Sequence, residues 1–176
     1  VPYLPSLSVI ATPADVRALP WFAEKYQCTG LFFPEVLNWH GDIFHTPAGA
    51  ETRLFYPGTP LGLKQVLPSI RLKHLRRGLQ DVAYLWILKQ RQRAGLARAI
   101  TNAMVRYACL DAVGDHYLDP LINGWVSDGD TWIQAHRMLA EEVSQAVHPN
   151  TRTEQDRIAD QVRWQRFTES TSSLAV

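Results

Sequence analysis

The sequence predicts an α/β protein whose second half is helical. Two apolar segments, residues 6–10 and 31–37, flank a segment with helix-start signals, which is the order of a strand–helix–strand unit. Most of the chain after residue 69 is compatible with helices separated by glycines and prolines. The 176 residues, with 46% apolar and 20% charged side chains, are typical of one globular domain.

The first strand is expected over residues 6–10 and is followed by a helix. Thr12 is a suitable N-cap, Pro13 fits the first helical position, and Asp15 suits the first turn. Residues 31–37 do not alternate in polarity, which is typical of a strand buried on both faces of a parallel sheet.

A long irregular segment, residues 38–68, separates the predicted unit from the helices. Loops of this length in a compact domain are usually functional, and we expect a short edge strand within it at residues 54–56. Two parallel strands do not make a stable sheet alone. The chain is therefore expected to be the C-terminal part of a larger α/β protein.

Ser69 begins the clearest helix of the sequence. At 100° per residue one face carries five apolar side chains: Leu72, Leu75, Leu79, Val82 and Trp86. Arg77 and Asp81 are spaced as an i,i+4 ion pair. Further helices are predicted over residues 96–110, 131–147 and 151–167, with a loop over 111–130 and a polar tail from 169.

Positive charge is concentrated in the middle of the chain. Residues 64–98 hold nine basic side chains and one acidic side chain, although the net charge is only +1. One interpretation is a helical module that binds an acidic partner or RNA. The alternative is a solvated helix face, which we prefer because the charges oppose the apolar stripe and no aromatic residues alternate with them. We therefore expect no nucleic-acid partner, and no apolar run is long enough to predict membrane insertion.

Several stretches form extended motifs. They are RALPWFAEKY at 17–26, TGLFF at 29–33 with LNW at 37–39, FYPG at 55–58, and PSIRLKHLRRGLQDVAYLW at 68–86. Together they resemble glycoside hydrolase family 123 and its uncharacterised relatives. The resemblance implies the C-terminal part of a TIM-like (β/α)₈ barrel, with 6–10 and 31–37 as its last two strands. The implied division is a barrel portion over 1–95, a helical extension over 96–168 and a flexible tail over 169–176.

The resemblance also implies an activity, which is exo-hydrolysis of β-linked N-acetylgalactosamine by a retaining, substrate-assisted mechanism. In that chemistry the acetamido oxygen of the substrate attacks the anomeric carbon, and two adjacent carboxylates, an Asp-Glu pair, assist. No Asp-Glu dipeptide occurs in the sequence, and Glu141-Glu142 is interpreted as solvated helix surface. The catalytic pair is therefore expected upstream of this chain, with no catalytic residue, metal or cofactor within it. The alternative is a non-catalytic carbohydrate-binding or scaffold protein derived from the same fold.

Five side chains are candidate substrate-binding residues: Glu35, Asn38, Trp39, Tyr56 and Arg71. Glu35 is interpreted as a ligand of sugar hydroxyls, as an ion-pair partner of Arg71 or Lys64, or as an exposed side chain. Trp39 suits stacking on a sugar ring or anchoring a loop. Tyr56 is a site or turn residue, and Arg71 a sugar ligand or a structural clamp. The expected partners are a carbohydrate substrate and the remainder of the barrel, either as an N-terminal part or as a second chain.

Overall fold

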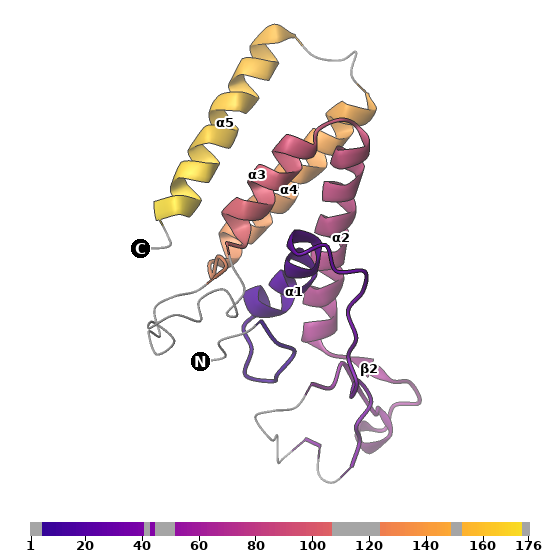
Figure 1. Ribbon diagram of the computed structural model, residues 1–176. Coiled ribbons are helices and arrows are strands. Elements are labelled where there is room, and N and C mark those ends of the chain that lie inside the picture. The colour runs from indigo at the N-terminus through magenta and orange to yellow at the C-terminus, as the bar shows by residue number, and fades with distance from the viewer. Residues whose placement is uncertain (1–4, 41–42, 45–51, 107–123, 149–152, 174–176) are drawn as a thin grey trace, which may run out of the picture.

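The computed structural model describes residues 5–40, 43–44, 52–106, 124–148 and 153–173 (Figure 1). This described part is mostly helical, with five α-helices and one two-stranded sheet. The helices are α1 (Pro13–Lys25), α2 (Ile70–Gln90), α3 (Ala94–Met104), α4 (Gly129–Val147) and α5 (Glu154–Ser173). Strands β1 (Phe55–Tyr56) and β2 (Leu67–Pro68) pair antiparallel around the short 3₁₀-helix η1 (Thr59–Leu61).

The two strands expected from the apolar segments are not formed. Residues 5–8 are irregular and lead into a turn at 9–10, and residues 31–33 are irregular before a turn at 34–37. Leu31 is exposed and Phe32 is 88% exposed, whereas a strand of a parallel sheet would bury both. Pro34 has no N–H for a ladder, and the described sheet pairs only β1 with β2, so neither segment forms a ladder with another strand. The described residues therefore contain no strand–helix–strand unit and no barrel strand.

Helix α1 begins where the sequence predicts it. The Thr12 hydroxyl accepts from the Asp15 backbone N–H at 3.3 Å, and the Asp15 carboxylate accepts from the Thr12 N–H at 2.7 Å. This reciprocal capping box satisfies two backbone donors that a helix start leaves without partners. Pro13 occupies the first turn, where its missing N–H costs nothing.

Helix α2 begins after Ser69, as predicted, and crosses α1 at Gly78. The Ser69 hydroxyl accepts from the Leu72 N–H at 3.2 Å and so caps the helix. A Cβ added at Gly78 would lie 2.5 Å from the Arg17 carbonyl oxygen and 3.1 Å from the ring of Pro20. The absence of a side chain at Gly78 therefore allows the two helix backbones to approach closely.

The apolar stripe predicted on α2 is only partly the buried face. Leu75 is buried, but Leu79 and Trp86 are exposed, and Trp86 is 58% exposed. The buried face is instead formed by Arg71, Leu75, Gly78, Asp81, Leu85 and Leu88. The predicted face was chosen from apolar residues alone. In the structure, α2 contacts α1 through Gly78 and Asp81. The basic residues Lys73, Arg76 and Arg77 are exposed, as the solvated-face interpretation predicts.

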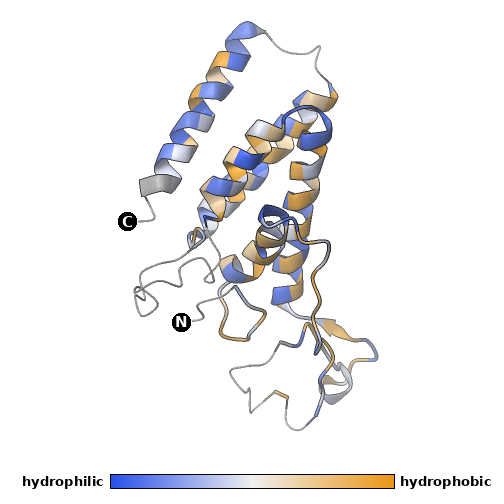
Figure 2. Ribbon diagram, in the orientation of Figure 1, coloured by the Kyte–Doolittle hydropathy of each residue, from blue (hydrophilic) through white to orange (hydrophobic). Residues whose placement is uncertain are grey.

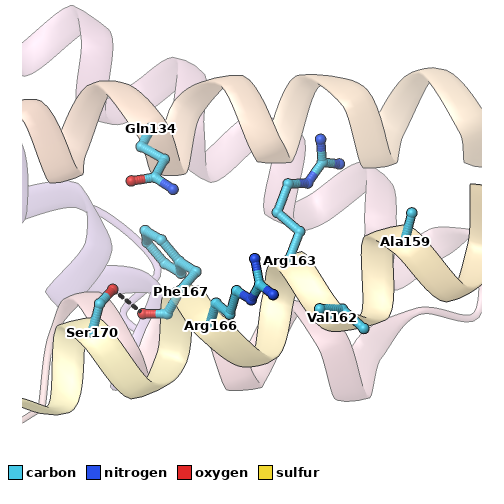
Figure 3. A pocket seen from close by; sticks show the side chains of 7 residues that line it. All are labelled: Gln134, Ala159, Val162, Arg163, Arg166, Phe167 and Ser170. Carbon is cyan, nitrogen blue, oxygen red and sulfur yellow. Dashed lines mark hydrogen bonds between the residues drawn. The ribbon is translucent and has the colours of Figure 1, made fainter.

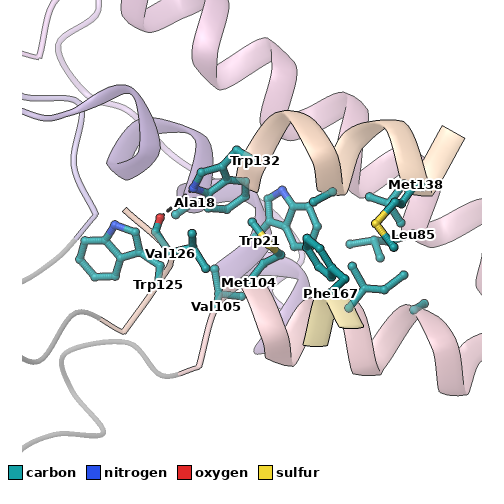
Figure 4. Packing of buried hydrophobic residues seen from close by; sticks show 14 of the residues in the cluster. Ala18, Trp21, Leu85, Met104, Val105, Trp125, Val126, Trp132, Met138 and Phe167 are labelled. Carbon is teal, nitrogen blue, oxygen red and sulfur yellow. Dashed lines mark hydrogen bonds between the residues drawn. The ribbon is translucent and has the colours of Figure 1, made fainter. Parts of the chain in front are cut away.

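One large hydrophobic cluster joins all five helices. Trp21, Leu85, Met104, Trp132 and Phe167 lie within it, one from each helix in chain order (Figure 4). The indole rings of Trp21 and Trp132 meet edge to face, with their centroids 5.4 Å apart. Figure 2 shows that hydrophobic residues are frequent in α3 and α4, whereas α5 is mostly hydrophilic. The regions expected as barrel portion and helical extension thus share one core.

A smaller cluster lies beside the sheet and joins it to α1 and α2. Its buried members are Leu7, Val16, Leu54 and Leu75. At the other end of the chain, α5 continues to Ser173, and Thr171 is buried within the segment expected as tail. The end of the helix predicted over 96–110 and much of the loop after it lie outside the described residues. No helix in the described ranges is both long enough and apolar enough to span a membrane.

Candidate functional site

The five predicted site residues lie in one region of the molecule, between the turn at 34–37 and the start of α2. The Val36 carbonyl oxygen accepts from the N–H groups of Leu54 and Phe55 at 3.1 and 3.4 Å. The Leu54 carbonyl oxygen accepts from the Ser69 N–H at 2.8 Å. These backbone bonds join the turn to the start of β1, and Leu54 before β1 to Ser69 before α2. Figure 1 shows β2 at the start of α2.

Trp39 is held by its indole nitrogen. The Nε1–H donates to the Phe55 carbonyl oxygen at 3.0 Å, and the residue remains 38% exposed. A single bond of this kind fixes the ring while leaving part of it in solvent. The geometry fits both interpretations of Trp39, because an anchored ring that stays accessible is also suited to stacking.

Glu35 and Asn38 are brought together by the turn. Asn38 Nδ2 donates to Glu35 Oε2 at 3.5 Å, and Asn38 Oδ1 accepts from the His40 N–H at 3.3 Å. Glu35 is exposed, and no described cation lies within ion-pair distance of it. The predicted pairs with Arg71 and Lys64 are therefore not formed, because the turn points this carboxylate away from a buried strand position and into solvent.

Arg71 is a buried clamp beneath Tyr56. Its Nη2 donates to the Tyr56 hydroxyl at 3.0 Å and to the Arg53 carbonyl oxygen at 2.5 Å, and the residue is only 5% exposed. Its Nε has no hydrogen-bond partner among the described residues. The Phe44 ring lies against Tyr56, with the centroids 5.9 Å apart. The structural-clamp interpretation of Arg71 thus describes its contacts, and Tyr56 is the part of this pair nearer to solvent.

The Tyr-Pro-Gly turn has a steric reason for its glycine. A Cβ at Gly58 would lie 2.1 Å from the Gln65 carbonyl oxygen and 3.0 Å from Cβ of Leu63. The N–H of Leu63 donates to the Gly58 carbonyl oxygen at 3.0 Å. The glycine lets the two arms of the turn close, which sets the position of Tyr56 in β1.

A polar cluster that the sequence did not predict lies further along α2, around Asp81. Asp81 is fully buried, and its carboxylate accepts from Arg17 Nε at 2.8 Å, Arg17 Nη2 at 3.1 Å and Trp21 Nε1 at 3.2 Å. The predicted pair of Asp81 with Arg77 is wrong, since Arg77 contacts Gln80 and His136 instead. Partners 60 and 64 residues apart leave no periodic signal in the sequence.

His136 on α4 completes this cluster. Its Nδ1 lies 2.5 Å from Asp81 Oδ1, and its Nε2 lies 3.2 Å from Arg77 Nη1. A guanidinium only donates hydrogen bonds, so Nε2 must accept and the proton sits on Nδ1, facing Asp81. The guanidinium of Arg17 also covers the Trp132 ring, 5.4 Å from its centroid. Asp81 and its donors thus connect α1, α2 and α4.

His74 on α2 and Glu142 on α4 are two further ionisable side chains that are wholly or partly removed from solvent. Burial, and then the positive charge of Arg17, lower the pKa of His74 below its usual value. Glu142 is buried and accepts from Arg93 Nη1 at 2.5 Å and from Trp164 Nε1 at 2.8 Å, so its interpretation as solvated surface is wrong. Glu141 beside it is exposed and pairs with Arg163. In the described ranges, no group of three or more His, Cys, Asp or Glu side chains is placed to hold a metal ion.

The fold and these contacts define a mostly helical protein with an exposed aromatic and polar region next to a small sheet. Comparisons of the chain with protein-family models, with curated proteins and with solved structures gave no match.

Proposed function

We propose that this chain forms part of the sugar-binding site of a carbohydrate-active hydrolase that acts on β-linked N-acetylgalactosamine. The resemblance of residues 17–86 to glycoside hydrolase family 123 suggested this function. The observation that carries the proposal is the ring of Trp39, which is anchored to Phe55 and partly exposed beside the polar pair of Glu35 and Asn38.

The side chains of this region match the chemistry of a sugar. A flat indole face suits the apolar face of a pyranose ring, and a carboxylate and an amide suit its hydroxyl and acetamido groups. Glu35 accepts hydrogen bonds from hydroxyls, whereas Asn38 both donates and accepts. Tyr56 in β1, which is hydrogen-bonded by Arg71, adds a second aromatic side chain.

In this proposal the chain binds and orients the sugar, and another segment supplies the acid pair. The acetamido oxygen attacks the anomeric carbon while the adjacent Asp-Glu carboxylates orient it and protonate the leaving oxygen. In this proposal that segment belongs either to an N-terminal part of the protein or to a second chain. Leu31 and Phe32, adjacent in the chain, and Leu37 in the turn that follows are exposed apolar residues, which makes them available for such a contact.

Titration with methyl β-N-acetylgalactosaminide, followed by NMR of the tryptophan indole N–H groups, tests the binding step. We expect the Trp39 signal to shift saturably and Trp39→Ala to abolish the response. Trp86→Ala is the matched control, because Trp86 is also exposed but lies on α2 away from the sheet. Failure of the sugar to shift the Trp39 signal, or equal losses in both variants, would contradict the proposal.

The alternative, a non-catalytic carbohydrate-binding protein, is favoured by one observation, the lack of an Asp-Glu dipeptide in the sequence. An assay of an aryl β-N-acetylgalactosaminide separates the two. We expect no turnover by this chain alone and turnover by the native assembly captured through it. Sugar binding without turnover in that assembly would instead support the non-catalytic function.

A further inference from the structure

A groove of about 460 Å³ lies between Gln134 on α4 and residues 159–170 on α5 (Figure 3). Its volume is within the range of small-molecule sites, about 300–1,000 Å³. We call it the α4/α5 groove. It lies outside the sugar-binding region proposed above, and none of its lining residues takes part in that region.

The α4/α5 groove has apolar lining along α5. Phe167 is buried, and its ring meets the Trp164 indole edge to face, with the centroids 5.9 Å apart. Val162, five residues before Phe167, is exposed, and Ala159 lies a further three residues towards the start of α5. This stretch offers an apolar surface that a hydrocarbon group of a ligand would cover.

The two arginines of the groove differ in their charge balance. Arg163 is neutralised, since Nη1 lies 2.7 Å from Glu141 and Nη2 lies 2.8 Å from Asp160. For Arg166, by contrast, no described residue forms an ion pair or accepts a hydrogen bond. Figure 3 shows its guanidinium in the space between the two helices. Arg166 is thus a cation facing an apolar groove without a protein counter-ion among the described residues.

We propose that the α4/α5 groove binds a small monocarboxylate with a short apolar tail. The carboxylate would accept from the Arg166 guanidinium, which presents paired donors to such a group, and from the Gln134 amide opposite. The tail would lie over Phe167 and Val162. The head group is placed at the Arg166 end because Glu141, at the Arg163 end, repels a second anion.

Isothermal titration calorimetry with octanoate, and with 1-octanol as the uncharged analogue of the same chain length, tests this site. We expect octanoate to bind and 1-octanol to bind at least tenfold more weakly. Arg166→Gln should weaken octanoate binding at least tenfold, and Val162→Gln should weaken both ligands. The matched control is Arg157→Gln, an exposed arginine on the same helix that lies outside the groove and pairs with Glu154.

Arg166 and Val162 are both exposed, so neither change should unfold the protein, and far-ultraviolet circular dichroism checks this. The proposal is overturned if octanoate does not bind at millimolar concentration, or if both ligands bind with equal affinity. It is also overturned if Arg166→Gln and Arg157→Gln have the same effect.

Discussion

At the scale of single residues, Asp81 shows how a buried charge depends on its partners. Its carboxylate accepts four hydrogen bonds, two from Arg17 and one each from Trp21 and His136. Arg17 is itself buried, so its guanidinium has exchanged hydration for this carboxylate. The net contribution of such a buried ion pair to folding stability is smaller than the stability lost when only one of its two members is removed.

We therefore expect Asp81→Asn to lower the free energy of unfolding by about 3–5 kcal/mol, because the change keeps the shape but leaves Arg17 without its counter-ion. Urea denaturation measures the loss. The control is Glu154→Gln, which breaks an exposed pair with Arg157 and should change stability by less than about 0.5 kcal/mol. Losses of equal size would show that the Asp81 cluster contributes no more than a surface pair.

His74 gives the protein a pH dependence whose sign is set by its surroundings. Burial and the nearby Arg17 lower its folded-state pKa, so the unfolded chain binds this proton more readily. The associated stability is fully present above the unfolded value of 6.5 and is lost as the pH falls from there through the folded-state pKa. We expect His74→Gln to show a flatter decline between pH 7.5 and 5.5 in urea titrations. A decline identical to that of the parent protein would exclude His74 as its source.

At the scale of elements, the crossing of α1 and α2 depends on Gly78. A methyl group there would meet the Arg17 carbonyl oxygen at 2.5 Å, and this backbone atom moves only if α1 moves. We expect Gly78→Ala to destabilise the protein by about 1–3 kcal/mol in urea denaturation, although alanine favours helix more than glycine does. Gly95→Ala in α3 is the control, since nothing lies within 4 Å of its added methyl group and it should be neutral or stabilising. Equal effects of the two changes would contradict the close-contact argument.

The features that could be predicted from the sequence are those that depend on residues close together in the chain. Thr12 and Ser69 cap the helices that their spacing predicted, because a capping bond joins residues two or three positions apart. Residues 31–37 were predicted as a strand because apolar runs usually enter a core, but a strand also needs neighbours that lie elsewhere in the chain. The five candidate site residues lie in one region because local hydrogen bonds and one hairpin connect their segments, and their role in binding stays a prediction. The Asp81 cluster was missed because its partners come from α1 and α4.

At the scale of the whole molecule, two kinds of apolar surface are distinguished by what they contact. Leu85 is fully buried where the helices meet, whereas Phe32 is 88% exposed on a segment without strand partners. Burial of Leu85 therefore contributes to the stability of this chain, and Phe32 contributes almost nothing to it.

We expect Phe32→Gln to change the free energy of unfolding by less than about 0.5 kcal/mol, and Leu85→Ala to lower it by about 2–5 kcal/mol. If the proposed function holds and Phe32 contacts the segment that supplies the acid pair, Phe32→Gln should also abolish the proposed β-N-acetylgalactosaminidase activity of the native assembly, while sugar binding at Trp39 persists. Urea denaturation, glycoside turnover and indole NMR measure these three properties separately. A glutamine at the centre of an apolar interface would leave its amide without hydrogen-bond partners. Full turnover by Phe32→Gln would therefore exclude Phe32 from the contact. A large loss of stability would instead show that Phe32 belongs to the core of this chain.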